Sequence, residues 1–183
     1  MSDILLENLR KAYIQLDEST GPTFCYMLYI TGSDRLKLKE LQDKLDLKGE
    51  KTPKDEFHVT IRYVRAKKSD DWKFFVEYLK RQEKLPRIRA KISGFKILGK
   101  DKDCLTLTVE SSELDKYFEK VNKWLTDNGY AKSDYSTYKP HITLTEQPNV
   151  EKPKWSSDYE FYVDLSMHIV SDTDHNKVFK KES

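Results

Sequence analysis

The sequence predicts an α+β fold with antiparallel sheets and helices on their outer side. Along the 183 residues, segments with apolar side chains at helical spacing alternate with short runs rich in β-branched and aromatic residues. Two of these β-rich runs are separated only by a loop of Gly, Lys and Asp, which is typical of an antiparallel hairpin. No low-complexity segment or long linker interrupts the chain, so we expect residues 1–183 to form a single domain.

The first half of the chain is expected to contain three helices and two strands. Gly21-Pro22 ends the first helix, so residues 1–20 form an N-terminal helical extension. In chain order, the elements are a helix over Ile4–Leu16, a strand over Thr23–Ile30, a helix capped by Ser33 or Asp34 that carries Leu36, Leu38, Leu41 and Leu45, a strand over Glu56–Val64, and a helix capped by Ser69 that carries Trp72, Phe75, Val76 and Leu79.

The second half begins with the hairpin and then repeats helix and strand. In chain order, the elements are strands over Arg87–Leu98 and Cys104–Glu110, a helix capped by Ser111 or Ser112 with Leu114, Tyr117, Phe118, Val121, Trp124 and Leu125 on one face, and strands over Pro140–Thr145, Glu160–Val170 and near Lys177–Lys180. Asn128-Gly129 supplies the stop of the helix. Each half therefore has a helix followed, across a loop, by a strand that carries His-x-Thr, which is a weak duplication in architecture.

Composition places the chain among soluble globular proteins and says little about its partner. The 33 Lys and Arg nearly balance the 31 Asp and Glu, so the basic excess typical of a nucleic-acid-coating protein is missing. No basic and apolar leader opens the sequence, and no apolar run approaches the roughly 20 residues of a membrane span. We expect a cytoplasmic protein without membrane association or an obligate protein partner. Cys25 and Cys104 are expected to be buried reduced thiols rather than a disulfide.

Two five-residue segments share nearly the same pattern, and each contains a histidine and a threonine two positions apart. These segments are Phe57-His58-Val59-Thr60-Ile61 and Pro140-His141-Ile142-Thr143-Leu144. Because side chains alternate faces along a strand, the histidine and threonine of each segment point one way and its apolar residues point the other. Each motif thus presents an imidazole and a hydroxyl side by side, above an apolar face.

A pair of such motifs suits the hydrolysis of a phosphodiester. A base must take a proton from the attacking water, and an acid must give one to the leaving oxygen. Histidine, with an ordinary pKa of about 6.5, can do either, and each transfer is worth roughly 10²–10⁴-fold in rate. The threonine hydroxyls can donate to the non-bridging oxygens as charge develops there. This chemistry calls for no metal and no other cofactor, and it leaves open which histidine is the base.

With these motifs the sequence resembles the 2H phosphoesterases, which include LigT-like and cyclic-phosphodiesterase-like enzymes and a phage anti-CBASS branch. FHVTI and especially YKPHITL are similar to the two motifs of that family, and the resemblance covers the chain from about Thr23 onward. It implies two lobes of antiparallel sheet around a central cleft, with His58, Thr60, His141 and Thr143 as the catalytic set. The helix before Leu16 lies outside the resemblance.

Four further residues are candidates for substrate binding. Arg62 is two residues beyond Thr60 and is expected to share its face, where it could pair with a phosphate. Tyr138 and Trp155 flank the second motif and could stack on a base, as could Tyr26 more weakly. The alternatives are structural: Arg62 could be a solvated charge at the end of a strand, and the aromatic side chains could belong to the core.

The two remaining histidines and their neighbours favour structural roles. His168 lies within the last long strand and is expected to be a satisfied, half-buried histidine. His175 lies in a polar turn and is expected to be solvated. A metal site formed by Asp172, Asp174 and His175 is poorly supported, because no paired ligand spacing appears elsewhere in the sequence.

The predicted partner is a nucleotide or oligonucleotide. The expected substrate is a 2′,3′-cyclic phosphate, a 2′–5′ oligonucleotide, or a cyclic di- or oligonucleotide signal of the kind that phage enzymes degrade to evade host defence. A basic run, Arg87, Arg89 and Lys91, could follow a nucleic-acid backbone, although one charged face of a half-buried strand explains it equally. The alternatives are a non-catalytic nucleotide- or RNA-binding module and a structural adaptor domain.

Overall fold

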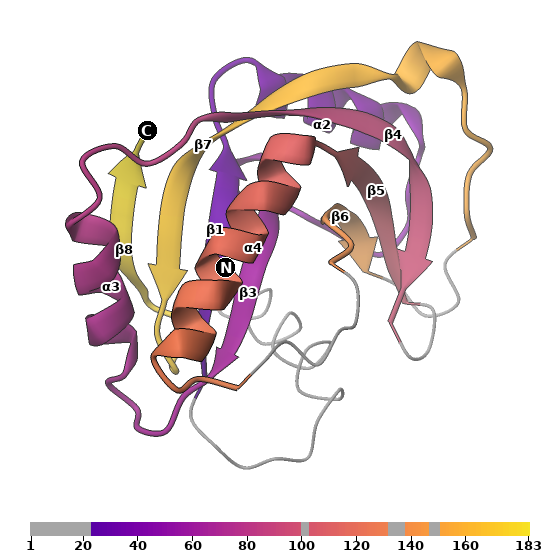
Figure 1. Ribbon diagram of the computed structural model, residues 1–183. Helices are drawn as coiled ribbons and strands as arrows, with labels where there is room; N and C mark the ends of the chain where they lie inside the picture. The colour runs from indigo at the N-terminus through magenta and orange to yellow at the C-terminus, as the bar shows by residue number, and fades with distance from the viewer. Residues whose placement is uncertain (1–22, 100–102, 132–137, 147–150) are drawn as a thin grey trace.

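The computed structural model describes residues 23–99, 103–131, 138–146 and 151–183. The expected helix over Ile4–Leu16, and with it the extension over residues 1–20, lies outside the described residues. Within them, the predicted α+β class is confirmed: helices pack on an antiparallel sheet (Figure 1).

All the strands among the described residues belong to one eight-stranded antiparallel sheet with the order β2-β6-β5-β4-β7-β1-β3, and β8 also pairs with β7. The strands are β1 (Thr23–Ile30), β2 (Glu50–Lys51), β3 (His58–Arg65), β4 (Ile88–Leu98), β5 (Cys104–Glu110), β6 (His141–Glu146), β7 (Phe161–Ser171) and β8 (Lys177–Glu182). The first half of β7 pairs with β4, and its second half pairs with β1 and β8. One lobe therefore contains β1, β3 and β8, the other contains β2, β4, β5 and β6, and β7 runs through both.

A bulge in β7 lets this one strand serve both lobes. Its register with β1 shifts between Tyr29 and Ile30, so that Ser166 is an extra residue. Before the bulge Val163 and Leu165 are in the core, and after it His168 and Val170 are. Because a bulge inserts one residue, it reverses which alternate side chains point inward.

Two of the three described helices are exchanged between the lobes. The helices are α2 (Asp34–Lys44), α3 (Trp72–Lys80) and α4 (Ser112–Asp127), and single 3₁₀ turns lie at Lys54–Glu56 and Ser157–Tyr159. Helix α2 follows β1 but hydrogen-bonds to β6, and α4 follows β5 but packs against β3, in front of β1 in Figure 1. Helices α2 and α4 thus each cover the sheet that carries the other half's motif, whereas α3 packs against β1 in the lobe of its own half.

The predicted boundaries of α4 are confirmed, whereas the start of α3 differs. The Ser111 hydroxyl accepts from the Leu114 amide, and Gly129 follows the helix with a φ of +82°, which suits glycine. Helix α3 begins at Trp72 after Asp71, not after Ser69. The Asp71 carboxylate is instead occupied by the amides of Lys67 and Lys68, which fixes the preceding turn.

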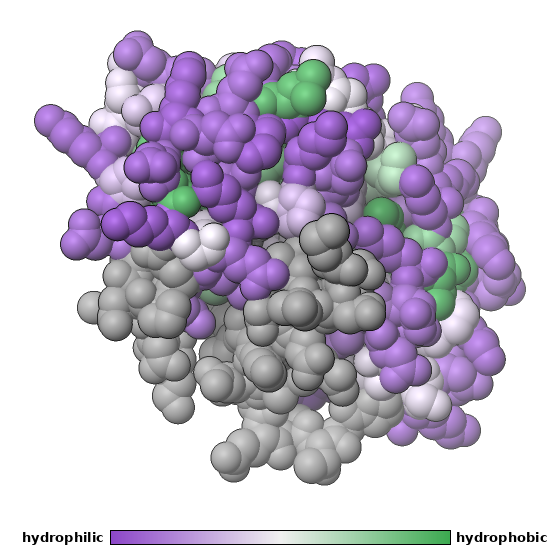
Figure 2. All heavy atoms as spheres, turned by 180° about the vertical axis from the view of Figure 1, so that it is seen from behind, coloured by the Kyte–Doolittle hydropathy of each residue, from purple (hydrophilic) through white to green (hydrophobic). Residues whose placement is uncertain are grey.

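The core lies on the helix-covered face of the sheet. It includes Phe24, Tyr26 and Leu28 of β1, together with apolar residues of α3 and α4. A second, smaller apolar cluster of Met27, Tyr29 and Ile169 lies on the opposite face. The outer surface seen in Figure 2 is mostly hydrophilic, with separate small apolar patches. No helix among the described residues is long and apolar enough to cross a membrane.

Candidate active site

The two His-x-Thr motifs come together where the sheet curls back on itself. His58 is the first residue of β3 and His141 is the first residue of β6, strands that are far apart in the sheet order yet contact each other (Figure 1). The buried apolar residues of both motifs point to the helix-covered side. His58, Thr60, His141 and Thr143 therefore lie on the helix-free face and are all half-buried.

Both histidines make the same backbone hydrogen bond. Nδ1 of His58 lies 2.7 Å from the Glu56 carbonyl oxygen, and Nδ1 of His141 lies 2.9 Å from the Lys139 carbonyl oxygen. A carbonyl oxygen can only accept, so Nδ1 carries a proton in each ring. Each neutral ring therefore presents the lone pair of Nε2, which can take a proton and give it back.

His58 lies under an aromatic ring and next to a lysine. The Tyr29 ring stacks on His58 with centroids 5.0 Å apart, and Nζ of Lys177 lies 4.9 Å from the centre of the Tyr29 ring. Lys177 also approaches Glu56, at 3.8 Å. Burial lowers the pKa of His58 to about 4, and the charges of His141 and Lys177 contribute to the same shift. His58 is therefore neutral at physiological pH.

His141 has more open surroundings. Across the sheet it pairs with Thr108, which in turn pairs with Gly94, so that a hydroxyl and a residue without a side chain are next to the imidazole. Burial lowers the pKa of His141, and the charge of Lys96 adds to the shift.

Each threonine is fixed by neighbours. Thr60 hydrogen-bonds with the Cys25 thiol, and its backbone carbonyl accepts from the Tyr138 hydroxyl at 3.1 Å. Thr143 pairs with Thr106, whose hydroxyl donates to the Lys96 carbonyl at 3.0 Å. Thr60 is thus held by side-chain and backbone contacts, and Thr143 is positioned by the pairing of its strand.

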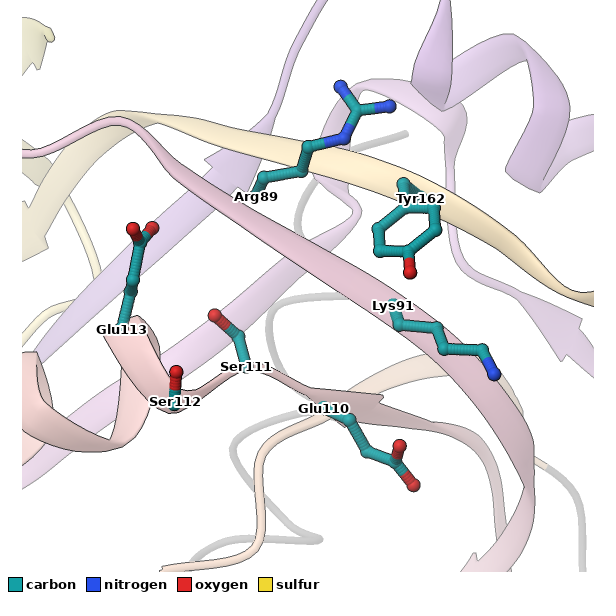
Figure 3. A pocket seen from close by; sticks show the side chains of 7 residues that line it. All are labelled: Arg89, Lys91, Glu110, Ser111, Ser112, Glu113 and Tyr162. Atoms are coloured by element: carbon teal, nitrogen blue, oxygen red, sulfur yellow. The ribbon is translucent and has the colours of Figure 1, made fainter.

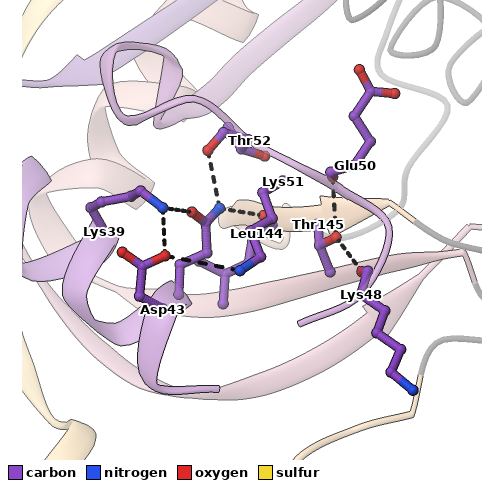
Figure 4. Close-up of polar contacts among 9 residues, drawn as sticks. Lys39, Asp43, Lys48, Glu50, Lys51, Thr52, Leu144 and Thr145 are labelled. Carbon is purple, nitrogen blue, oxygen red and sulfur yellow. Dashed lines mark hydrogen bonds and ion pairs between the residues drawn. The ribbon is translucent and has the colours of Figure 1, made fainter. Parts of the chain in front are cut away.

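The strand that carries the second motif is anchored by residues of the first half of the chain. The buried Gln42 amide, on α2, donates to the carbonyls of Leu144 at 2.7 Å and of Thr52 at 3.0 Å. The Thr145 hydroxyl approaches the carbonyls of Lys48 and Glu50 (Figure 4). These contacts satisfy buried backbone groups at the end of β6 and hold its register.

The prediction that Arg62 shares the face of His58 is wrong. The pairing of β1 with β3 shifts between Tyr26 and Met27, which leaves Ile61 as an extra residue on β3. Arg62 consequently pairs with Tyr26 on the helix-covered side, is only 7% exposed, and donates to the Ala131 carbonyl at 2.6 Å. The prediction assumed that side chains alternate faces without interruption along the strand, and the extra residue of the bulge breaks this alternation.

Tyr26 is a core residue and not part of the site. It is 0% exposed, and its hydroxyl lies 2.7 Å from that of Tyr117 and 2.5 Å from Nδ1 of His168. Nε2 of His168 lies 2.9 Å from the Pro86 carbonyl. That carbonyl requires a proton on Nε2, so the Tyr26 hydroxyl donates to Nδ1. His168 is satisfied as expected, but fully rather than half buried.

The remaining aromatic candidates have different positions. Trp155 packs edge-on against Phe95, with centroids 4.9 Å apart, on the face opposite to His141. It therefore supports the core and does not stack on a ligand beside His141. Tyr138 reaches the site through its bond to Thr60, but one face of its ring is stacked on Phe118 at 4.0 Å. Tyr138 is the candidate binding residue that lies next to a motif.

Sequence reasoning missed Tyr29, Lys177 and Lys96. Tyr29 and Lys177 reach His58 from β1 and β8, and only the strand register reveals this proximity. The pairing of Tyr29 with His58 follows from β1–β3 register, which sequence alternation alone does not determine.

The cysteines are free as expected, whereas His175 is half-buried and not solvated as expected. Cys25 and Cys104 are free thiols, and burial raises the pKa of each to about 12. Cys25 is half-buried and Cys104 is buried. The Asp172 carboxylate accepts from the backbone amides of Asp174 and Asn176 and so closes the turn that contains His175. Within the ranges that the structure describes, no three His, Cys, Asp or Glu residues are grouped as a metal site.

An open depression lies further along the helix-free face of β4 and β5. It is lined by Arg89, Lys91, Glu110, Ser111, Ser112, Glu113 and Tyr162 (Figure 3). Its cations are already paired: Arg89 approaches Asp164 at 3.5 Å and Lys91 pairs with Glu160 at 2.8 Å. Arg87 also pairs with Asp164. The positive charges of Arg87, Arg89 and Lys91 on this face of β4 are therefore neutralised by ion pairs.

The fold is similar to several solved structures. TT0787 of Thermus thermophilus has a TM-score of 0.66 at 14% identity, over 87% of this chain and 97% of that one. E. coli LigT complexed with 3′-AMP has a TM-score of 0.60 at 12% identity, over 88% and 94%. The MHV ns2 PDE domain has a TM-score of 0.55 at 14% identity, over 82% and 99%. These likenesses show the fold expected of the 2H phosphoesterases.

A search among curated proteins finds no match to this chain. A family model, in contrast, covers most of it, including both His-x-Thr motifs and every described strand from β2 to β7. That model is described as Anti-CBASS protein Acb1 and matches residues 26–180, so the chain belongs to the Acb1 family.

Proposed function

We propose that the protein is a metal-independent phosphodiesterase that hydrolyses a phosphodiester in a cyclic nucleotide or oligonucleotide. Its catalytic set is His58, Thr60, His141 and Thr143. The observation that carries the proposal is the matched pair of Nδ1–carbonyl hydrogen bonds, which leave Nε2 of both histidines available on the same face. Two such groups supply both proton transfers, so the reaction does not need a metal-bound hydroxide.

His58 is the general base and His141 is the general acid. The neutral His58 takes a proton from water as the new O–P bond forms. As the old P–O bond breaks, a protonated His141 gives its proton to the leaving oxygen. Thr60 and Thr143 donate hydrogen bonds to the non-bridging oxygens, where negative charge accumulates. Water is consumed, one P–O bond is exchanged for another, and no oxidant or reductant takes part.

The substrate class rests on the relatives. LigT has been solved with phosphate and with 3′-AMP, which supports a nucleotide phosphate as the reacting group. Membership of a family described as anti-CBASS supports a role in evading host defence through a cyclic nucleotide signal. A 2′,3′-cyclic phosphate and a 2′–5′ oligonucleotide are the other members of the proposed class.

The test is turnover of 2′,3′-cyclic nucleotides, 2′–5′ oligoadenylate and 3′–3′ cyclic dinucleotides in the presence of EDTA, with products identified by linkage. We expect activity on at least one of them, and a loss of roughly 10²–10⁴-fold in His58→Ala and in His141→Ala. His175→Ala, in the turn between β7 and β8, is the matched histidine control, and we expect it to keep full activity. Full activity in both motif variants would refute the site, and nucleotide binding without turnover in the wild type would indicate a binding module. Neither binding nor turnover would indicate an adaptor domain.

A further inference from the structure

The strands of the two motifs contact each other without being paired. Strands β3 and β6 are not neighbours in the sheet order, and no strand pairing joins them within the described ranges. A hydrogen-bonded ladder holds neighbouring strands about 4.8 Å apart, but no such ladder sets the distance between His58 and His141. Two imidazoles that act on one phosphate need a fixed separation, so other contacts must provide it.

Tyr138 provides one such contact, from the segment before the second motif to the backbone of the first. It lies three residues before His141, and its hydroxyl donates to the Thr60 carbonyl at 3.1 Å. Strand β3 ends the sheet order, and its ladder with β1 is interrupted directly after Thr60, at the bulge residue Ile61. This stretch of backbone can therefore accept a hydrogen bond from outside the sheet.

The ring of Tyr138 is held as firmly as its hydroxyl. It stacks on the Phe118 ring with the centroids 4.0 Å apart and the planes parallel. Phe118 belongs to α4, which packs against β3. A tyrosine side chain has two rotatable torsions, and contacts at both the ring and the hydroxyl leave it little freedom. Tyr138 is therefore a rigid link between α4, the first motif and the start of the second.

Arg62 makes a second link between β3 and the same part of the chain. Its buried guanidinium donates to the Ala131 carbonyl at 2.6 Å and to the Tyr63 carbonyl of its own strand at 3.1 Å. Ala131 follows α4, and Tyr138 precedes β6. The bulge at Ile61 turns Arg62 toward this side, and the planar guanidinium can bond two carbonyls at once. The connection from α4 to β6 is thus hydrogen-bonded to β3 at two positions.

We propose that Tyr138 and Arg62 are positioning residues that set the separation of His58 and His141. Tyr138 acts through its hydroxyl and the Thr60 backbone, and not by stacking on a nucleobase. Arg62 acts through the Ala131 carbonyl, and not by pairing with a phosphate. This inference rests on the proposed function, because the separation matters only when both histidines act on the same phosphate.

The main test is Tyr138→Phe, which removes the hydroxyl and keeps the ring on Phe118. On the nucleotide that the wild type hydrolyses, kcat should fall roughly 10-fold and KM should change less than about three-fold, because a small misplacement of a catalytic group slows the chemical step. On a p-nitrophenyl ester of a nucleotide, which needs no acid, the loss should shrink to less than about three-fold. A variant that is merely less stable would lose the same factor on both substrates.

Tyr130→Phe is the matched control. It also removes a hydroxyl that donates to a backbone carbonyl, that of Asp71 at 3.4 Å, and this bond reaches neither motif. We expect it to alter neither kcat nor KM. Arg62→Met should reproduce the pattern of Tyr138→Phe, and if it does not fold, Tyr138→Phe decides alone.

Three results in Tyr138→Phe would overturn the proposal: a raised KM with an unchanged kcat, which indicates a substrate contact; equal losses on both substrates; and no loss on either. Should the wild type hydrolyse neither the nucleotides nor the ester, the proposed function fails, and the positioning role is decided by calorimetry with inorganic phosphate. Weaker binding to Tyr138→Phe than to the wild type and Tyr130→Phe supports the role. Equal binding, or binding to none of the three proteins, refutes it.

Discussion

His58 and His141 each hydrogen-bond the carbonyl two residues before them, but their surroundings differ. His58 is covered by the Tyr29 ring and lies near Lys177, which is itself occupied by Glu56. His141 lies beside Thr108 and Gly94, and the next row holds Lys96, whose ammonium has no acceptor in the described part of the chain. The motif therefore determines the tautomer, and the neighbouring strands determine how the two rings differ in solvation and charge.

The same contrast continues on the core side of the two lobes. Behind His58, the buried polar groups include a chain of Tyr117, Tyr26 and His168, which ends on the Pro86 carbonyl. Behind His141, the buried polar groups include the Gln42 amide, which cannot titrate. The lobe of His58 should therefore respond to pH in its stability, whereas the anchor of the His141 lobe should not.

The largest effect should come from separating the roles of the two histidines. With a p-nitrophenyl ester of a nucleotide, the leaving group departs without a proton, so the acid is no longer needed. We expect His141→Ala to retain most of its activity on this substrate, whereas His58→Ala still loses roughly 10²–10⁴-fold. Steady-state kinetics on the ester and on the natural linkage measure this difference. Recovery of His58→Ala in place of His141→Ala would reverse the roles.

The next effect concerns the pH dependence of stability in the lobe of His58. Burial, assisted by the charge of Lys181, lowers the pKa of His168 to about 4, whereas the unfolded chain has about 6.5. Between these values the unfolded state binds more protons than the folded state. The free energy of unfolding should therefore fall as the pH drops from about 6.5 to 4, by up to about 3 kcal/mol for this residue. His58 contributes in the same direction.

Urea unfolding at several pH values tests this assignment. His168→Gln should reduce the slope of unfolding free energy against pH by up to about 1.4 kcal/mol per pH unit within that window. The slope is informative even if the variant is less stable throughout. An unchanged slope in His168→Gln would show that His168 is not the titrating group.

The smallest effect concerns the anchor of the other lobe. Gln42→Leu leaves the buried carbonyls of Leu144 and Thr52 without this donor, and we expect a loss of about 1–3 kcal/mol in unfolding free energy at every pH. Gln82→Leu makes the same chemical change at a more exposed amide and should cost less than about 0.5 kcal/mol. A pH-dependent loss in Gln42→Leu would contradict the contrast between the lobes.

Local patterns were enough to predict much of the fold. The strands Thr23–Ile30 and Cys104–Glu110 have the bounds expected from their β-rich composition. Helix α4 begins after the expected cap at Ser111 and stops at the expected Asn128-Gly129. These features depend on residues close together in the chain, which is why sequence reasoning found them.

Predictions that depended on the register between paired strands were less successful. Simple alternation of side chains along the strand predicts Arg62 on the face of His58. The bulge at Ile61 turns the Arg62 side chain to the opposite face. Tyr26 and Trp155 are aromatic candidates for stacking on a base, but both pack on the helix-covered side. An aromatic side chain serves a core or a ligand equally well, so its identity does not reveal which face it occupies.

The sequence by itself determined the class of fold, the two His-x-Thr pairs and the phosphodiester chemistry that they predict, because alternation along a short strand is a local property. Only the tertiary structure decided which residues surround each histidine: Tyr29 and Lys177 for one, Thr108 and Lys96 for the other. Those neighbours come from other strands, and their positions depend on bulges and on the curl of the sheet. Such long-range pairing is set by the packing of the whole chain rather than by any short segment.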